Sequence, residues 1–190
     1  MNTKALAISI VFAALTVALN PAISGIGVPA PYAPYLIYGL WEIPIVAAFL
    51  LVSPAAGILI SLLNAAVLFA LFPGALPAGP FYNLVALFSM LLGVFIGRKF
   101  FATKSSREQN VLKIAAASTI LGIIIRVAVM SIVNFVTLQQ SYPFGFGLDE
   151  FSVLSIFVPA TALFNTTVTL YTVPMGEFIT DVVKSRLKMQ

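Results

Sequence analysis

The sequence predicts an all-α membrane protein, a six-transmembrane-helix bundle that forms one domain over residues 1–190 with both termini cytoplasmic. Of the 190 residues, 61% are hydrophobic and 8% are charged, whereas soluble domains are closer to half apolar and a quarter charged. The chain divides into six apolar stretches, and its basic residues gather in alternate connections. These charged residues are too few to cover the surface of a water-soluble domain. Most of the surface must therefore face lipid.

Each apolar stretch is a candidate membrane span, because a hydrocarbon core of about 30 Å needs about 20 helical residues. The second and third stretches meet at a minimal turn, Ser53-Pro54. The sixth has Pro159 at its start and Pro174 inside it, where a kink is expected. The predicted spans cover about residues 4–20, 36–52, 54–72, 81–97, 111–138 and 158–183. This pattern predicts a multi-pass protein of the cell (plasma) membrane.

The basic residues indicate the orientation, because cytoplasmic loops are enriched in Lys and Arg. With the N-terminus inside, the external connections contain Asp149 and Glu150 but no basic residue. The net charge of +4 then reflects topology, and a nucleic-acid partner is not expected. Nine of the ten basic residues fall on the cytoplasmic side: Lys4, Arg98, Lys99, Lys104, Arg107, Lys113, Lys184, Arg186 and Lys188.

The first apolar stretch could instead be a cleaved signal peptide, since a lysine precedes the run ALAISIVFAALTVAL. The following NPAISG is a poor cleavage site, and five more spans follow. We therefore interpret residues 4–20 as a membrane helix.

The composition excludes most catalytic and metal-binding chemistry. The chain has no Cys and no His, which excludes thiol nucleophiles, disulfides, common zinc sites and the usual neutral-pH general base. The acids near spans, Glu42, Glu177 and Asp181, are too widely separated to form an obvious dyad or metal cluster. We therefore predict no catalytic residue, no metal site and no cofactor.

Three predicted external loops are rich in Pro, Gly and aromatic residues: VPAPYAPY (28–35), FPGALPAGPF (72–81) and QQSYPFGFG (139–147). Elaborate loops on one face suggest a lid over a pocket that opens outward. An aromatic belt at the membrane interface is the alternative interpretation.

Arg126 lies near the centre of the fifth predicted span. A central arginine costs roughly 2.5–3.5 kcal/mol on insertion scales, so it is expected to face the protein interior with a partner. Glu42 is the candidate partner, because it is the acid that could lie well within a span on the outer half. The pair could be purely structural, or Arg126 could contact an anionic or carbonyl-rich ligand.

Amide side chains lie near the outer ends of several spans. Asn134 is eight residues after Arg126, with Met130 between them, so the three share one broad helix face. Asn64, Asn83 and Asn165 lie in other spans, and such amides can also simply join helices. Because these amides lie beneath the aromatic loops, they favour a pocket lined with polar side chains. The candidate substrate-binding residues are Trp41, Glu42, Asn83, Arg126, Asn134 and Asn165.

Small residues recur in the first predicted helix. Ser9 and Ala13 are four residues apart, as are Ala14 and Ala18. This spacing lets another helix approach closely, and it suits either a partner-docking surface or ordinary packing within the chain.

Four stretches resemble the S-components of energy-coupling factor (ECF) transporters, most closely the riboflavin-type branch. They are ALAISIVFAALTVAL, EIPIVAAFLLVSPAAGILISLLNAAV, VMSIVNF with the following Tyr142-Pro143, and ALFNTTVTLY. The resemblance implies a six-helix subunit that binds a vitamin from outside. Its implied partners are membrane lipid, a transmembrane scaffold subunit and two cytoplasmic ATPase subunits.

The resemblance also implies roles for matching residues. Asn134 and Asn165 match asparagines that hydrogen-bond the flavin ring, and Glu42 falls on an acidic position near the pocket mouth. Ser9 and Ala13 fall on an A-x-x-x-A scaffold-docking motif, with Ser9 replacing the first alanine. Val168 departs from the riboflavin pattern, which often has a lysine there. Arg126 then either compensates from the neighbouring helix or marks a different ligand.

The expected function is therefore high-affinity binding of riboflavin, a related flavin or another small vitamin-like ligand, without chemistry. The chain has no G-x-x-x-x-G-K-[ST] loop, so ATP-driven work would come from partner subunits. The alternatives are a self-contained secondary carrier, a structural membrane subunit and an intramembrane enzyme. The lack of inverted-repeat similarity argues against a secondary carrier.

Overall fold

The computed structural model describes residues 3–71, 76–101 and 107–187. The described chain is mostly helical, and it includes one two-stranded antiparallel hairpin. In chain order the elements are α1 (Thr3–Leu19), α2 (Pro21–Ser24), β1 (Val28–Ala30), β2 (Ala33–Tyr38), α3 (Glu42–Leu51), α4 (Pro54–Leu71), α5 (Gly79–Phe101), α6 (Arg107–Leu138), α7 (Glu150–Ser152), the π-helical turn η1 (Val153–Phe157) and α8 (Val158–Leu187).

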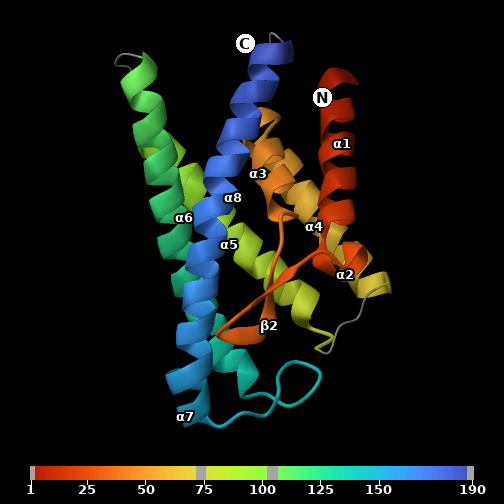
Figure 1. Cartoon of the computed structure of the whole chain (residues 1–190), viewed down its shortest axis with the longest axis vertical. Helices are drawn as coiled ribbons and strands as arrows, with labels where there is room; N and C mark the ends of the chain where they lie inside the picture. Colours follow the sequence, from red (N-terminus) through yellow and green to blue (C-terminus); the bar gives the residue numbers. More distant parts are fainter. Residues whose placement is uncertain (1–2, 72–75, 102–106, 188–190) are drawn as a thin grey trace.

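The two ends of the bundle differ in character. Both termini lie at one end, and the hairpin and α7 lie toward the other (Figure 1). The last turns of α5 and α8 carry basic residues at the terminal end: Arg98, Lys99, Lys184 and Arg186. Lys104 and Lys188, which the sequence also assigns to this side, lie outside the described residues, as do 72–75 of the second aromatic loop. The basic residues therefore lie at the end opposite the hairpin and α7. The cytoplasmic location of the termini remains a prediction.

A partly exposed ion pair joins two helices at the basic end. Nη1 of Arg98 on α5 lies 2.8 Å from a carboxylate oxygen of Glu177 on α8. The Arg98 side chain is 36% exposed, so this pair is expected to add little stability.

Four helices in the described chain are long and apolar enough to cross a membrane: Pro54–Leu71, Gly79–Phe101, Leu112–Leu138 and the continuous rod Glu150–Arg186. Two shorter apolar helices accompany them, α1 with 17 residues and α3 with 10. The structure therefore bears out a multi-pass helical protein, while the count of six spans remains a prediction.

The second predicted span begins later than the sequence suggests. Residues 36–38 belong to strand β2, and the helix starts only at Glu42. Nine of the ten residues of α3 are buried, so this short helix is enclosed by α1, α4 and α8. A helix that is apolar all round reads as a membrane span whether its neighbours are lipid or protein, and that ambiguity explains the misplaced boundary.

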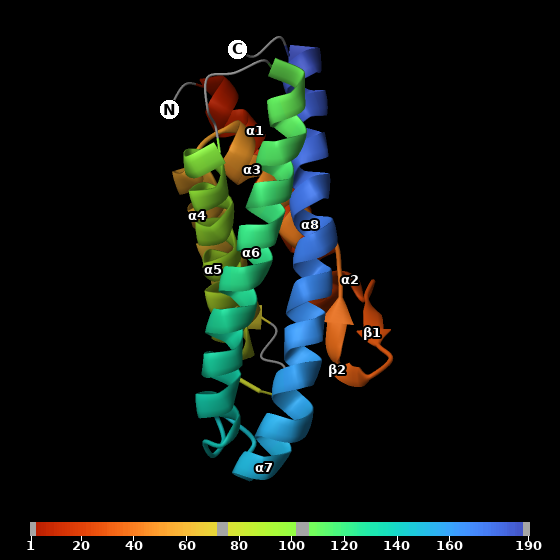
Figure 2. The same cartoon turned by 90° about the vertical axis from the view of Figure 1, so that its left-hand side faces the viewer.

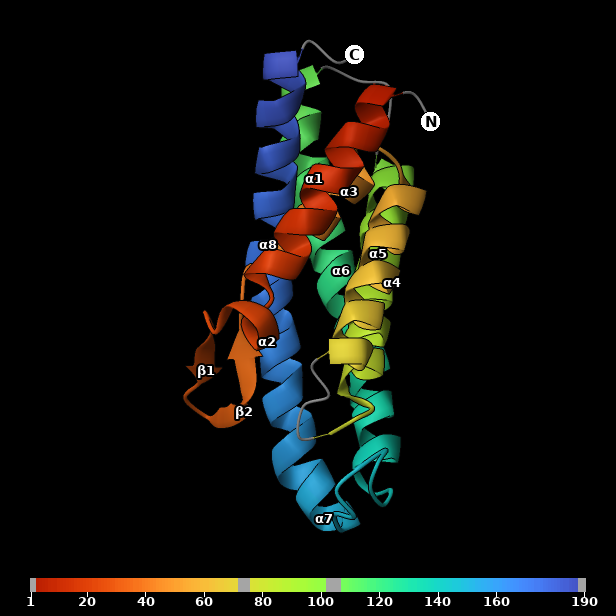
Figure 3. The same ribbon diagram turned by 90° about the vertical axis from the view of Figure 1, so that its right-hand side faces the viewer.

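The first aromatic loop folds as the β1–β2 hairpin, which the sequence does not predict. Figures 2 and 3 show the hairpin lying beside α8. Its tyrosines make the contact: the Tyr38 ring centroid lies 4.8 Å from that of Phe164, and Tyr35 lies 5.6 Å from Phe157. Aromatic packing thus fixes the hairpin against η1 and the adjoining turns of α8.

The sixth predicted span also extends further than expected. Helical structure begins at Glu150, runs through η1 and continues past Pro174. Asp149 caps the start by accepting a hydrogen bond from the backbone N–H of Ser152 at 2.9 Å. The Ser152 hydroxyl and amide lower the pKa of the Asp149 carboxyl, which favours the charged cap.

Helices α5 and α6 pack backbone to backbone. Gly93 and Gly97 on α5 are four residues apart, and a Cβ added at Gly97 would lie 2.7 Å from the Cα of Ser118 on α6. A Cβ added at Gly93 would meet the backbone of Leu121 and Gly122. Small residues at this spacing permit such close approach in membranes, so any larger side chain would force the two helices apart.

Candidate functional site

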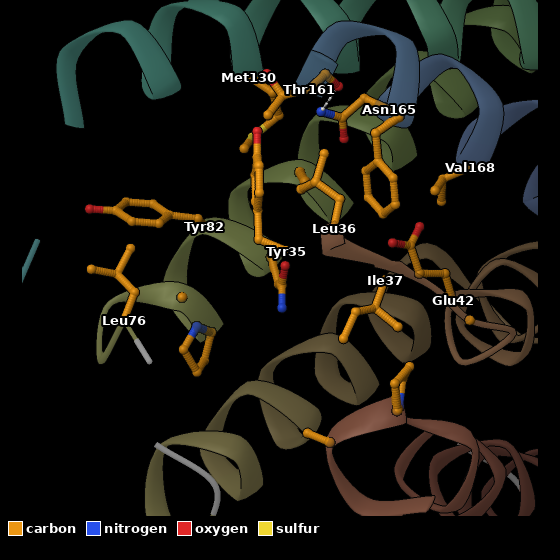
Figure 4. Close-up of a pocket in the computed structure, with 18 of the residues that line it drawn as sticks. Tyr35, Leu36, Ile37, Glu42, Leu76, Tyr82, Met130, Thr161, Asn165 and Val168 are labelled. Carbon is orange, nitrogen blue, oxygen red and sulfur yellow. Dashed lines mark hydrogen bonds between the residues drawn. The ribbon is translucent and has the colours of Figure 1, made fainter. Parts of the chain in front are cut away.

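A cavity of about 550 Å³ lies toward the hairpin end of the bundle, within the range of roughly 300–1,000 Å³ typical of small-molecule sites. Helices α5, α6 and α8 supply most of its wall, and α3, β2 and the loops at the hairpin end add further residues (Figure 4). The structure brings all six candidate substrate-binding residues to this one cavity: Trp41, Glu42, Asn83, Arg126, Asn134 and Asn165.

Arg126 forms a buried bidentate ion pair with Glu42. Nη1 donates to one Glu42 carboxylate oxygen at 2.5 Å and Nη2 to the other at 2.9 Å. The two residues are only 3% and 4% exposed. The structural arrangement of the Arg126–Glu42 pair is thus as the sequence suggests, and planar fork-to-fork pairing makes it a strong charge-assisted contact.

Asn165 is tied into the same network from α8. Its side-chain oxygen accepts a hydrogen bond from Nε of Arg126 at 2.8 Å, and its amide nitrogen donates to the Thr161 carbonyl at 2.8 Å. The Thr161 bond appears as a dashed line in Figure 4, where the Glu42 side chain is also drawn. Three helices, α3, α6 and α8, therefore meet through side chains in the cavity wall.

The other candidate residues leave polar groups open to the cavity. Asn134 is 8% exposed, and its amide makes no hydrogen bond within the described part of the chain. Asn83 lies exposed in the first turns of α5, and Trp41 is buried directly before α3. A buried amide without a protein partner is costly, so Asn134 is well suited to bond a ligand.

Sequence reasoning missed several residues of the wall. The Tyr171 hydroxyl lies in the cavity and donates to the Gly39 carbonyl at 2.7 Å. Asn20, read only as the end of the first span, caps α2, lines the cavity and donates to the Asn64 side chain at 3.4 Å. Nothing in the sequence pairs these residues, because each contact joins segments far apart in the chain.

Aromatic residues at the hairpin end of the bundle line the cavity. Tyr35 of β2 and Phe146 of the 139–147 loop both line it. Tyr82 on α5 also lines it, and its hydroxyl donates to the Phe144 carbonyl of that same loop. Burial raises the pKa of the Tyr35 phenol, so this ring stays neutral at physiological pH. The described residues of all three loops thus contribute to the cavity wall, including Leu76 and Pro80 of the 72–81 loop, and the lid interpretation remains a prediction.

The small residues of α1 point in different directions. Ser9 and Ala13 are half-buried, with Ala13 packed against the apolar core and the Ser9 hydroxyl bonded to the Ala5 carbonyl at 2.9 Å. Ala14 and Ala18 are exposed. The surface that α1 offers to another helix is therefore mainly the Ala14–Ala18 side, and its docking role remains a prediction.

The comparisons with known proteins identify the fold. No protein-family model matches the sequence, and no curated protein does. Among solved structures, the chain is similar to the S component of a bacterial ECF transporter, with a TM-score of 0.71 and 24% sequence identity. The match covers 99% of this chain and 97% of that one. Over its whole length the chain therefore has the fold of an ECF-transporter S component.

Proposed function

We propose that this protein is the substrate-binding S component of an ECF-type uptake transporter for a small vitamin-like molecule. The observation that carries the proposal is that all six candidate residues line the same cavity inside an S-component fold. The ligand would enter from the hairpin end and be covered by the aromatic loops. A transmembrane scaffold subunit and two cytoplasmic ATPases would supply the energy, since the chain itself has no phosphate-binding loop.

Riboflavin or a related flavin is the first ligand to test. The wall combines aromatic rings, which suit stacking against a planar heterocycle, with the amides of Asn134 and Asn165. Val168 lines the cavity, so this position offers an apolar contact in place of a lysine. Arg126 lies on the neighbouring helix with its guanidinium paired to Glu42, so it does not replace a lysine as an open cationic contact.

A riboflavin titration followed by flavin fluorescence tests the ligand. We expect saturable quenching with detergent-purified protein, and about 5- to 150-fold weaker binding in Asn134→Ala, because a lost hydrogen bond in a buried site costs about 1–3 kcal/mol. Gln140→Ala is the matched control, since this exposed amide lies outside the cavity wall. An Asn134→Ala variant that binds as well as the control would remove Asn134 from the site.

Reconstitution tests the transport role separately from the ligand. We expect the chain to co-purify with a scaffold subunit and two ATPases when these are co-expressed, and uptake into vesicles to require ATP. Uptake by the purified chain alone would instead establish the self-contained carrier.

A further inference from the structure

The cavity wall contains one positive and one negative group that neutralise each other. Among the described residues that line it, Glu42 and Arg126 are the charged ones, and each is the other's bidentate partner. The net formal charge of the wall is therefore zero. An arginine in a ligand cavity would ordinarily suggest an anionic ligand. Here the Glu42 carboxylate already occupies the edge of the guanidinium at which an anionic ligand would bind.

The donors of Arg126 are almost completely used within the protein. A guanidinium has five N–H groups and no acceptor. Two donate to Glu42, one to Asn165, and one from Nη1 points to the Met90 sulfur at 3.4 Å. A single Nη2 N–H has no acceptor among the described residues. Arg126 can thus offer a ligand one hydrogen bond, but not a vacant carboxylate site.

Arg126 also fixes which way the Asn165 amide points. Because the guanidinium only donates, the amide oxygen must face Nε, and the amide nitrogen faces the other way. One N–H of that nitrogen goes to the Thr161 carbonyl, which leaves one N–H free. The groups that Arg126 and Asn165 leave over are therefore N–H donors, which require acceptor atoms on the ligand.

We infer that Glu42 sets the charge selectivity of the cavity. By holding Arg126 in a closed pair, Glu42 makes this part of the wall neutral and rich in donors, so the cavity takes a ligand that is uncharged there and presents carbonyl oxygens or ring nitrogens. An anionic group would meet the Glu42 carboxylate at close range in a poorly screened site. This inference rests on the proposed function, in that it assumes the cavity binds a small molecule.

Matched neutral and anionic ligands test the selectivity. Suitable pairs are panthenol and pantothenate, biotinamide and biotin, and nicotinamide and nicotinate, with riboflavin as a further neutral probe. We expect wild-type protein to bind the neutral member of any pair it accepts at least about tenfold more tightly, because like-charge contacts cost several kcal/mol. In Glu42→Gln the preference should shift toward the carboxylate by at least about tenfold. Glu177→Gln, which removes an acid outside this cavity, should leave the ratio unchanged.

Small anions test the same inference without the natural ligand. Glu42→Ala leaves a void beside Arg126. Acetate can fill this void and neutralise the Arg126 charge, whereas acetamide, its neutral counterpart, can fill it but cannot neutralise the charge. We expect acetate to raise the thermal stability of Glu42→Ala, or its folded yield if the variant folds poorly, while acetamide does neither. Wild-type protein should not respond to acetate, because its own carboxylate occupies the position.

The two experiments separate the failure of the inference from that of the proposed function. If wild-type protein prefers carboxylates, if acetate stabilises it as much as the variant, or if acetate leaves Glu42→Ala unchanged, the inference is overturned. If wild-type protein binds none of the vitamin probes while acetate rescues Glu42→Ala, the proposed vitamin-binding function fails. Charge compensation of Arg126 by Glu42 would in that case still stand.

Discussion

Replacing Arg126 with leucine should destabilise the protein strongly, because it leaves the Glu42 carboxylate buried without a partner. The substitution removes both bonds to Glu42 and the bond to Asn165. Breaking a buried ion pair by deleting one member typically costs about 3–5 kcal/mol. For a chain of 190 residues, at about 2–4 °C per kcal/mol, the melting temperature should fall by about 6–20 °C.

Replacing both members of the pair should cost much less than replacing one. Buried pairs exchanged for apolar residues are often neutral or even stabilising. The double variant Glu42→Leu with Arg126→Leu should therefore melt well above Arg126→Leu. In the double-mutant cycle, the coupling between the two sites should reach about 2 kcal/mol or more, near the upper end for directly contacting residues.

The single tryptophan is a convenient reporter for this cycle. Trp41 precedes Glu42 and is 7% exposed, so its fluorescence should change sharply when the bundle opens. Thermal unfolding of the four proteins in one detergent gives the cycle directly. If Arg126→Leu melts within about 2 °C of wild type, a shift of at most about 1 kcal/mol, or if the double variant is no more stable than Arg126→Leu, the ion pair does not stabilise the bundle as argued.

Three further predictions concern the rest of the bundle. Gly97→Leu should lower the free energy of unfolding by at least about 1–3 kcal/mol through overpacking, while Gly79→Ala, where a Cβ meets nothing within 4 Å, should be well tolerated in the same thermal assay. Arg98→Ala removes a partly exposed ion pair and should cost no more than about 1 kcal/mol; a loss of about 3–5 kcal/mol, as for a buried pair, would contradict this. Because the chain has no native cysteine, Ser141→Cys should react with an impermeant maleimide in intact cells and Ser185→Cys only after permeabilisation; the reverse pattern would invert the orientation.

The sequence was sufficient to predict six residues of the cavity wall: Trp41, Glu42, Asn83, Arg126, Asn134 and Asn165. Charged and amide side chains in apolar spans are expensive to expose to lipid, so they must turn inward, and inward-facing residues at similar depth converge. Arg126 and Glu42 follow this reasoning to a direct contact. The structure shows that Arg126 and Glu42 meet, whereas the ligand-binding role of the six candidate residues remains a prediction.

The hairpin and the length of α3 could not be predicted in the same way. The segment 28–38 carries three prolines and several aromatics, and these are equally suited to a loop, an aromatic belt or a strand. Its strand form depends on pairing with a second segment and on tyrosine contacts with α8. Similarly, the contact of Tyr171 with Gly39 joins residues 132 positions apart, which periodicity within one segment cannot reveal.

The backbone contact between α5 and α6 limits how this protein can change shape. With no side chain between the helices at Gly93 and Gly97, the two backbones are in direct contact over more than one turn, and we expect α5 and α6 to move together. Helices α5 and α6 would then move as one rigid unit, and Asn83, Arg126 and Asn134 would keep their positions relative to one another. Movements that admit or release a ligand must then take place along the opposite side of the cavity, where the hairpin rests on α8 through a few aromatic contacts.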